Sequence, residues 1–339
     1  MNERAGPEFK DMEWGNGTFR PLRLPAPRRV DEALGSSVNG LLCSWAQEIG
    51  LRGQELTDFA ACNYGRYMML VHPDTNDLDR LVLAARWMSA LFIQDDRYCD
   101  EASLGADPRL VGQRLALALE AVDPAHLPPG PLATRLDAAR RQDPVLAALR
   151  SAITHMSRYA TASQMARVRA DTAWLFVATN AQTTWRTTGV TPPVWEYLAH
   201  RQRNSFAVCM DLVDVVGGYE LAADVYHRPL VRRAVMLAAT AATIVNDLHS
   251  VARERAADLG DFNLALAIEA ERGCTLHDAV DTAVEIHNAY TRAYENTEAP
   301  LLAAGPTELA RFLRALREWM AGSAEYHRHS IRYREGTGI

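Results

Sequence analysis

Apolar residues recur three and four positions apart along most of the chain, and this helical period limits the possible fold more than any other feature of the sequence. No segment shows the sustained alternation of apolar and polar residues that a half-buried strand requires. The sequence therefore predicts an all-α fold. The segments with a helical period are 33–49, 56–71, 77–97, 108–122, 143–159, 163–187, 193–216, 228–257, 260–271, 275–296 and 307–332.

The breaks between these segments contain residues that begin or end helices, such as the Pro pair within residues 190–193. Residues 1–30 contain Gly, Pro and Arg without an apolar period, which predicts an extended or disordered lead. We expect one α-helical domain over residues 31–335 to follow. A split into two bundles at the Pro-rich stretch 123–131 is the alternative, because 339 residues can bury one large core or two smaller ones.

Thirty-five of the 36 basic residues are Arg, and the single Lys, Lys10, lies in the N-terminal lead. P-loop nucleotidases, pyridoxal phosphate enzymes and Schiff-base aldolases each need a Lys in the folded site, so these classes are excluded. A ligand that carries phosphate must therefore be held by Arg, by backbone amides or by a metal ion. The Arg excess itself is most simply explained by a GC-rich coding sequence.

The net charge of −6 argues against nucleic acid as a partner, since a nucleic-acid-binding face is basic. The five cysteines are scattered without the spacing of a zinc site, and the first residues contain no apolar signal segment. These features predict a reduced, cytoplasmic location. The most apolar run, residues 234–245, has twelve residues and is too short to span a membrane, which takes about 20.

A cluster of acidic residues follows the predicted helix over residues 81–94, which is apolar on nearly every face. The cluster consists of Asp95, Asp96, Asp100 and Glu101. The C-terminal end of a helix has a negative dipole and disfavours further negative charge, so the clustering indicates that a cation binds here. For the Asp pair taken alone, a solvated helix end is the alternative.

A second apolar helix, residues 234–245, leads into Asn246, Ser250 and Glu254, which lie four apart and so share one helix face. Amide, hydroxyl and carboxylate oxygens suit Mg²⁺, whereas a zinc site would contain His or Cys. This spacing alone also arises by chance, but two such clusters about 150 residues apart favour a paired metal site. A paired site at the mouth of an apolar cavity suits the removal of diphosphate from a hydrocarbon. The metal neutralises the leaving group, and apolar walls keep water from the carbocation.

The two clusters resemble two motifs of the class I terpene synthases. DDRYCDE at 95–101 is similar to the aspartate-rich motif of that family, and NDLHSVARE at 246–254 fits its Asn/Ser/Glu triad at every defined position. Residues 197–201 resemble the segment that ends in a diphosphate-sensing Arg, and Arg332-Tyr333 resembles the C-terminal Arg-Tyr pair.

From about residue 30 to residue 335, the chain most resembles the bacterial 2-methylisoborneol synthases and their close relatives, which cyclise a C-methylated geranyl diphosphate. The resemblance implies a single-domain helical bundle around an apolar cavity, with 2-methylgeranyl diphosphate as the substrate. The implied product is 2-methylisoborneol or a related methylated monoterpenoid. A cyclase of geranyl or farnesyl diphosphate is the alternative, and a homodimer is expected from the same resemblance.

The resemblance also implies a set of site residues and three bound Mg²⁺ ions. The implied metal ligands are Asp95, Asp96, Asp100, Asn246, Ser250 and Glu254. The implied diphosphate-binding residues are Arg201, Arg332 and Tyr333. Asn204 and Ser205 match the helix break that links the sensing Arg to a backbone carbonyl aimed at the substrate.

The acidic motif departs from the shortest family form, because Cys99 stands where DDxxD has its last carboxylate. The third acidic ligand is therefore Asp100 or Glu101, and Asp95 is the surest of the set. Asp96 has the alternative role of pairing with an Arg when the site closes.

Six aromatic residues are candidates for the wall of the cavity, although each one alone is more simply explained as core packing. They are Trp87, Phe92, Phe176, Trp185, Phe206 and Trp319. We expect two or three of them to face the substrate, first of all Phe92 and Phe206, which adjoin motif residues. Near the C-terminus, Tyr326 and His327 stand where relatives often carry a Trp, and His249 is expected to lie outside the ligand set.

Two other functions compete with cyclisation. A prenyl chain-elongating transferase shares the fold and Mg²⁺ but needs two aspartate-rich motifs, whereas the second cluster here is of the Asn/Ser/Glu type. A catalytically inactive helical scaffold would have no reason to retain both oxygen clusters.

Overall fold

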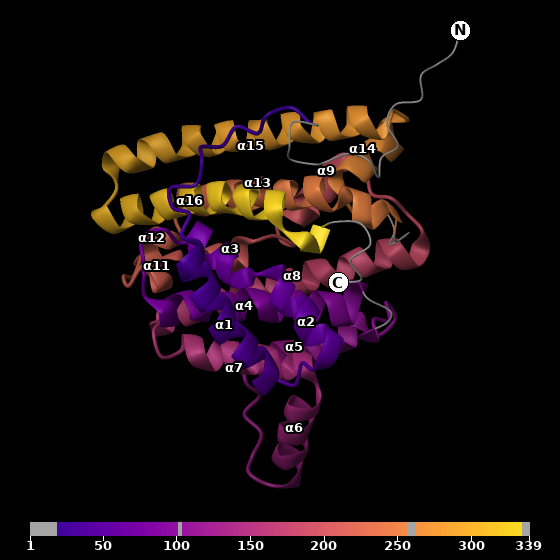
Figure 1. The fold of residues 1–339 in the computed structure, drawn as a ribbon, viewed down its shortest axis with the longest axis vertical. Coiled ribbons are helices and arrows are strands. Elements are labelled where there is room, and N and C mark those ends of the chain that lie inside the picture. Colours follow the sequence, from indigo (N-terminus) through magenta and orange to yellow (C-terminus); the bar gives the residue numbers. More distant parts are fainter. Residues whose placement is uncertain (1–18, 101–103, 257–261, 334–339) are drawn as a thin grey trace.

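A computed structural model describes residues 19–100, 104–256 and 262–333, and every regular element in these ranges is a helix (Figure 1). The predicted all-α fold is confirmed. The longer helices are α1 (Glu32–Glu48), α2 (Gly53–Cys62), α3 (Tyr64–Val71), α4 (Leu78–Asp95), α5 (Val111–Val122), α6 (Pro131–Gln142), α7 (Pro144–Met156), α8 (Ala162–Thr188), α9 (Val194–Arg201), α13 (Pro229–Ala256), α14 (Leu264–Arg272), α15 (Leu276–Ala304) and α16 (Thr307–His329). The short ones are η2 (Asp96–Asp100), α10 (Ala207–Met210), α11 (Val213–Val216), α12 (Ala223–Tyr226) and η4 (Ile331–Tyr333).

One continuous hydrophobic core joins helices from both halves of the chain. It contains Leu81 of α4 and Leu115 of α5 together with Leu149 of α7, Val235 of α13 and Phe312 of α16. A smaller cluster lies between α9, α14, α15 and the C-terminal half of α13. Because helices before and after the Pro-rich stretch share the same core, the chain forms one domain rather than two bundles.

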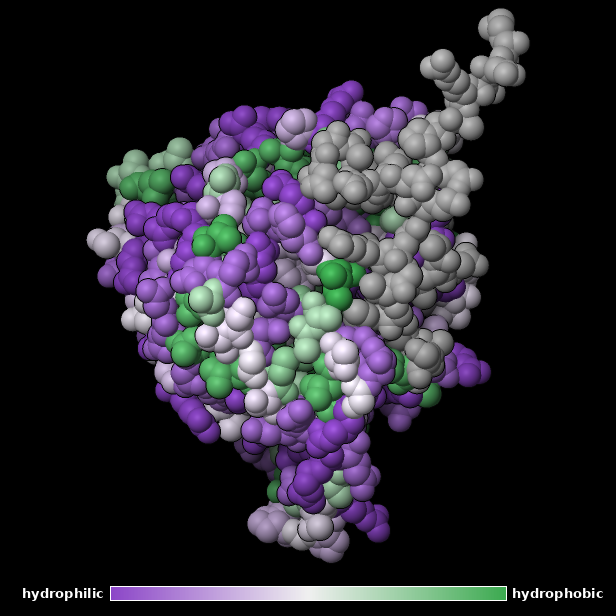
Figure 2. Space-filling model, in the orientation of Figure 1, coloured by the Kyte–Doolittle hydropathy of each residue, from purple (hydrophilic) through white to green (hydrophobic). Residues whose placement is uncertain are grey.

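Helix α13 is the central element, and it packs against α15 on one side and α16 on another (Figure 1). Its residues 229–255 are long and apolar enough to cross a membrane, but 83% of the most apolar window is buried inside the bundle. A helix that is apolar on all sides is what a core position requires. On the face of the molecule shown in Figure 2, hydrophilic residues predominate and hydrophobic ones form small, scattered groups.

Residues 19–30 follow an extended path over the outside of α15 and α3 (Figure 1). The Arg23 backbone N–H donates to Asn288 Oδ1 at 2.6 Å, and the Arg23 side chain pairs with Glu295. Further along, Arg29 donates to the backbone carbonyls of Met69 at 2.7 Å and His72 at 2.9 Å. The first eighteen residues of the predicted lead lie outside the described residues.

Several element boundaries differ from the predicted ones for local reasons. The predicted 56–71 helix divides at Asn63, which adopts φ +52° and whose side chain accepts the Arg66 N–H at the start of α3. The predicted 193–216 helix ends at Arg201 and resumes as the short α10 and α11. Helix α6 is absent from the prediction because none of its residues is buried, so its sequence has no apolar period. In Figure 1 it lies apart from the rest of the bundle.

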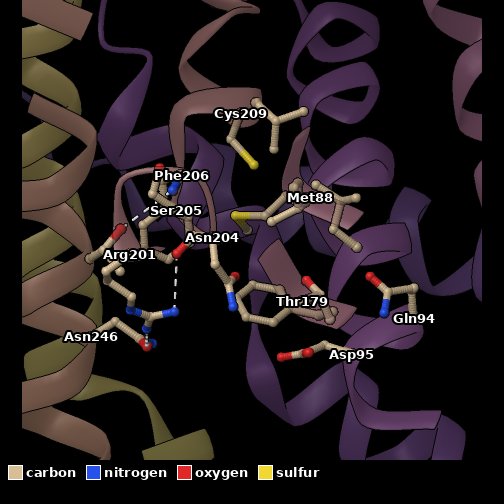
Figure 3. A pocket seen from close by; sticks show the side chains of 15 residues that line it. Met88, Gln94, Asp95, Thr179, Arg201, Asn204, Ser205, Phe206, Cys209 and Asn246 are labelled. Carbon is tan, nitrogen blue, oxygen red and sulfur yellow. Dashed lines mark hydrogen bonds between the residues drawn. The ribbon is translucent and has the colours of Figure 1, made fainter. Parts of the chain in front are cut away.

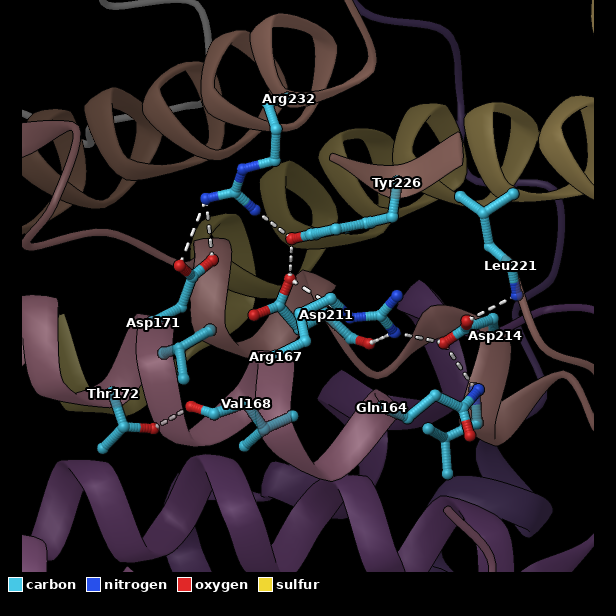
Figure 4. A network of polar contacts seen from close by, with 12 residues as sticks. Gln164, Arg167, Val168, Asp171, Thr172, Asp211, Asp214, Leu221, Tyr226 and Arg232 are labelled. Atoms are coloured by element: carbon cyan, nitrogen blue, oxygen red, sulfur yellow. Dashed lines mark hydrogen bonds and ion pairs between the residues drawn. The ribbon is translucent and has the colours of Figure 1, made fainter. Parts of the chain in front are cut away.

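A buried polar network holds the chain between α10 and α13 against α8 (Figure 4). Arg167 Nη2 donates to Asp214 Oδ1 at 2.6 Å and to the backbone carbonyl of Asp211 at 2.5 Å. The other Asp214 oxygen accepts the backbone N–H of Leu221 at 3.0 Å. Tyr226 donates to the Asp211 carboxyl group, the pKa of which is raised to about 8 by burial and by Asp171. Both Asp211 and Asp214 are fully buried, so this segment is fixed by charges as well as by packing.

The free energy of unfolding is expected to fall between pH 7 and pH 5, and replacing His287 of α15 with Phe should make this fall smaller by about 2 kcal/mol. Burial of His287, which is 0% exposed, lowers its pKa to about 4. His287 takes up a proton near pH 6.5 in the unfolded chain but only near pH 4 in the folded chain. Stability therefore falls as the pH falls through this range. Urea unfolding of both proteins at the two pH values measures the difference. The same change at the exposed His277 should leave the pH dependence unaltered, and equal slopes for all three proteins would contradict the assignment.

Candidate active site

The ends of the two apolar helices meet at one pocket, which is also bounded by α8 and by the break between α9 and α10 (Figure 3). The pocket contains about 590 Å³ of empty space, part of it open to solvent. Asp95 from α4 and Asn246 from α13 lie at the same end of this pocket, on opposite walls. Its apolar lining includes Met88, Leu91 and Leu175. Oxygen-bearing side chains from two helices therefore share one end of a pocket whose lining is partly apolar.

The acidic cluster divides into one residue at the cavity and two in ion pairs. Asp95 lines the cavity, and its pKa is raised to about 7 by burial and by the nearby charges of Asp100 and Asp96. Arg332 donates to both oxygens of Asp96, at 2.6 and 3.0 Å, and Arg186 donates to Asp100 at 2.6 Å.

In this structure the predicted ligands Asp96 and Asp100 are each paired with an arginine. Asp96 adopts the alternative role that the sequence allowed, pairing with an Arg. Glu101 lies outside the described residues. The acidic cluster therefore offers Asp95 as its carboxylate at the cavity, among the residues that the structure describes.

The Asn/Ser/Glu triad follows one side of α13, and Asn263, the N-cap residue of α14, fixes two of its members. Asn263 Nδ2 donates to Glu254 Oε2 at 2.9 Å and lies 3.5 Å from Ser250 Oγ. The same nitrogen donates to the backbone carbonyl of Asp247 at 2.8 Å. Burial, with the charge of Asp247, raises the pKa of Glu254. A buried carboxyl group with a raised pKa gains from a cation beside it.

Arg201 lies beside the triad at the end of α9. It donates to Asp247 Oδ1 at 2.6 Å, to the backbone carbonyl of Asn204 at 3.1 Å and to Asn246 Oδ1 at 3.4 Å. The hydroxyl of Tyr197 donates to the second oxygen of Asp247 at 2.6 Å. Arg201 is thus held by the carboxylate of Asp247 and hydrogen-bonded to the backbone carbonyl of Asn204 at the helix break.

The helix break is held by short polar contacts around Asn204 and Ser205. Asn204 Nδ2 donates to Gln182 Oε1 of α8 at 2.6 Å, and Ser205 Oγ donates to the backbone carbonyl of Gln202 at 3.0 Å. Both residues line the pocket. The break therefore places polar groups at the cavity instead of continuing α9 as a regular helix.

Arg332 lies in η4, at the C-terminal end of the described chain, and is 4% exposed. Its guanidinium lies 4.6 Å from the centroid of the Phe92 ring, so one cation contacts both Asp96 and the cavity aromatic. The Tyr333 side chain lies outside what the structure describes.

Two of the six candidate aromatics line the pocket, namely Phe92 and Phe206. Of the other four, Trp87, Phe176 and Trp319 are buried in the surrounding core, and Trp185 is partly buried against the smaller cluster. Trp87 donates from its indole to the backbone carbonyl of Val208 at 3.2 Å, Phe176 is buried in the main core, Trp185 stacks on Phe262, and Trp319 packs behind Phe206. Large apolar rings fill space on every side of the cavity, so sequence alone does not tell a wall residue from its support.

Three residues of the site are not among those predicted from the sequence. Arg186 pairs with Asp100, but nothing local distinguishes it from the other arginines of the chain. Asp247 was overlooked inside the triad motif, although an Asp within a buried helix indicates a charged partner. Asn263 stands before an apolar run, and this N-cap signal could have located it.

The donor set fits Mg²⁺. A carboxylate oxygen of Asp95 and an amide oxygen of Asn246 line the pocket from two walls, and Ser250 and Glu254 follow Asn246 along α13. Burial with like charges raises the pKa of Asp95, as expected where a cation is to be bound. Throughout the described ranges, no three His, Cys, Asp or Glu side chains are grouped as a metal site. Asp95, Asn246, Ser250 and Glu254 are the residues that could hold the ion.

Known proteins resemble the chain over nearly all of its length. Residues 86–293 match terpene synthase family 2, C-terminal metal binding. The 2-methylisoborneol synthase of Streptomyces ambofaciens is 38% identical over 322 residues, covering 92% of this chain and 70% of that protein. The enzyme of the same name from Streptomyces griseus is 39% identical over 91% of this chain and 70% of that protein.

A solved structure shares the fold of this chain over nearly its whole length. It is 2-methylisoborneol synthase from Streptomyces coelicolor A3(2) in complex with Mg²⁺ and 2-fluoroneryl diphosphate, with a TM-score of 0.86 at 36% identity, covering 93% of this chain and 95% of that chain. Pristinol synthase of Streptomyces pristinaespiralis is more distant, at 27% identity over 94% of this chain and 85% of that protein. The family match, the relatives and the shared fold agree with the site geometry: the chain belongs to terpene synthase family 2 and is a class I terpene cyclase, a lyase that acts on diphosphates.

Proposed function

We propose that the chain cyclises 2-methylgeranyl diphosphate to 2-methylisoborneol or a related methylated monoterpenoid. The observation that carries this proposal is the similarity to 2-methylisoborneol synthases, at 36–39% identity over more than nine tenths of the chain. A cyclase of farnesyl diphosphate is the second candidate, because the (+)-T-muurolol synthase of Roseiflexus castenholzii, named as farnesyl diphosphate cyclizing, is 27% identical over 86% of the chain.

In this proposal the catalytic domain spans residues 31–335 and binds three Mg²⁺ ions. Asp95 and Asn246 on the two walls of the pocket would hold them, together with Ser250 and Glu254 further along α13. Bound Mg²⁺ supplies positive charge that neutralises the departing diphosphate. The chain would bind the same diphosphate through the forked guanidinium groups of Arg201 and Arg332 and the hydroxyl of Tyr333, which match the Arg requirement set by the lack of lysine.

The remaining walls would shape the hydrocarbon and exclude water. Phe92 and Phe206 present aromatic faces to the cavity, where they favour a cation by its attraction to the ring. Met88, Leu91 and Leu175 supply apolar surface between them. Arg201 donates a hydrogen bond to the backbone carbonyl of Asn204 at 3.1 Å. A movement of Arg201 on binding diphosphate would therefore also move the helix break.

Incubation of the purified full-length protein with Mg²⁺ and each of three substrates tests the assignment. We expect 2-methylgeranyl diphosphate to be turned over with a kcat/KM about tenfold or more above those of geranyl and farnesyl diphosphates, because one methylene or methyl group in an apolar pocket is worth about 10-fold or more. Mass spectrometry of the volatiles identifies the products. Preference for farnesyl diphosphate, or no turnover of any of the three, would contradict the proposal.

A further inference from the structure

A buried histidine outside the predicted ligand set contacts the first residue of the triad. His327 of α16 is 1% exposed, and its Nε2 lies 3.2 Å from Nδ2 of Asn246. Its other ring nitrogen, Nδ1, lies 2.7 Å from the backbone carbonyl oxygen of Ser323. Both nitrogens of the ring are therefore engaged, one with α16 itself and one with α13.

These two contacts determine which ring nitrogen carries the hydrogen. A backbone carbonyl only accepts, so Nδ1 must donate to Ser323. In the neutral imidazole, Nε2 is then an acceptor, and it can pair only with the NH₂ group of Asn246.

The hydrogen bond in turn determines the orientation of the Asn246 amide. With Nδ2 directed at His327, Oδ1 is on the side of Arg201, whose Nη2 lies 3.4 Å away. The reverse orientation would set the amide oxygen against the lone pair of Nε2 and the NH₂ group against a guanidinium. In that orientation, neither of these two contacts would pair a donor with an acceptor.

The imidazole is itself held by its neighbours. It meets the ring of Tyr67 edge to face at 5.6 Å and the ring of Phe206 at 6.1 Å. The Tyr67 hydroxyl and Ser323 Oγ are 2.7 Å apart, and Ser323 Oγ lies 3.3 Å from Nδ1 of His327. A rotation of the ring would break these contacts together, so His327 is a rigid acceptor.

We propose that His327 is a positioning residue that accepts a hydrogen bond from Asn246 Nδ2 and thereby presents Asn246 Oδ1 to Mg²⁺. The inference rests on the metal ligands assigned under the proposed function. An Asn that turned its NH₂ group toward the cation would have to rotate before it could bind, which weakens affinity for the metal. Groups that orient metal ligands in this way are typically worth 10- to 100-fold in metal affinity.

The test measures binding of inorganic pyrophosphate to the full chain by titration calorimetry over a series of Mg²⁺ concentrations. His327→Phe keeps a ring of similar size but removes the acceptor, and His327→Asn keeps a donor for Ser323 but is too short to reach Asn246. Both should raise the Mg²⁺ concentration for half-maximal binding by about tenfold or more. His327→Gln carries an oxygen at a similar reach and should stay within about threefold of the unchanged protein. His287→Phe, which removes a buried histidine of α15, should leave the midpoint unaltered and serves as the control.

Three outcomes overturn the inference. They are a Mg²⁺ midpoint for the folded Phe or Asn variant that equals that of the unchanged protein, a Gln variant as weak as the Phe variant, and an unchanged protein that binds pyrophosphate without need of Mg²⁺. Circular dichroism identifies a variant that fails to fold, in which case the other acceptor-free variant decides. Pyrophosphate carries no prenyl chain, so a shifted midpoint in a protein that does not turn over 2-methylgeranyl diphosphate would uphold the role of His327 and reject the proposed substrate.

Discussion

Replacing Asn246 or Asp95 with Ala is expected to lower the turnover of a prenyl diphosphate by about 10³-fold while the protein remains helical. The two residues lie on opposite walls at one end of the cavity, and each is a ligand of Mg²⁺ under the proposed function. Without either one, the charge that develops on the diphosphate is left partly uncompensated in an apolar surrounding. A loss of about 4 kcal/mol in the transition state corresponds to the expected factor.

Product formation is measured by mass spectrometry of the volatiles, and the helix content by circular dichroism. Asp137→Ala on α6 is a suitable control for Asp95→Ala, because that Asp lies outside the core on a helix with no buried residue. Its turnover should equal that of the unchanged protein. If either site variant kept more than about a tenth of the normal turnover, the assignment of that oxygen to the metal would be wrong.

Asp214→Ala is expected to lower the free energy of unfolding by about 3–5 kcal/mol, the largest loss of stability expected from one substitution outside the cavity. The change removes the nearer of the two carboxyl groups that face the Arg167 guanidinium, which is 6% exposed, and leaves Asp211 at 3.8 Å. It also removes the acceptor of the Leu221 N–H. A buried charge without its partner costs far more than the pair itself contributes.

Urea unfolding followed by circular dichroism measures the effect. Asp224→Ala lies in the same part of the chain, where the Asp224 side chain is 79% exposed, and it should change stability by no more than about 0.5 kcal/mol. Equal midpoints for the two variants would show that the network contributes nothing. Val208 and Cys209 line the cavity just before this segment, so Asp214→Ala should also broaden the range of products.

The parts of the fold that were predictable from the sequence are those where local chemistry and tertiary packing agree. The apolar runs of α4 and α13 are long, and the oxygen residues follow each run directly, so the two walls of the site could be recognised before the fold was known. Arg201 and Arg332 could be distinguished from the other arginines by their sequence positions relative to the motifs.

The parts that could not be predicted depend on contacts between distant segments. Asp96 and Asp100 look alike in sequence, and their pairing with Arg332 and Arg186 is decided by how η4 and α8 pack against α4. Helix α6 has no buried residue, so the periodicity that revealed the other helices is missing from it. His327 was noticed only as a departure from relatives, because its role depends on α16 lying beside α13.

The π-helical turn η2 after Asp95 has a consequence for how such chains are recognised. A π turn is what a helix becomes when it accommodates one additional residue without a change in the residues before it. The acidic segment can therefore gain or lose a residue while Asp95 stays in register with α4. Length variation just after the first Asp is then nearly neutral for the fold, and a search that demands DDxxD at fixed spacing will pass over enzymes that retain the first Asp in its place.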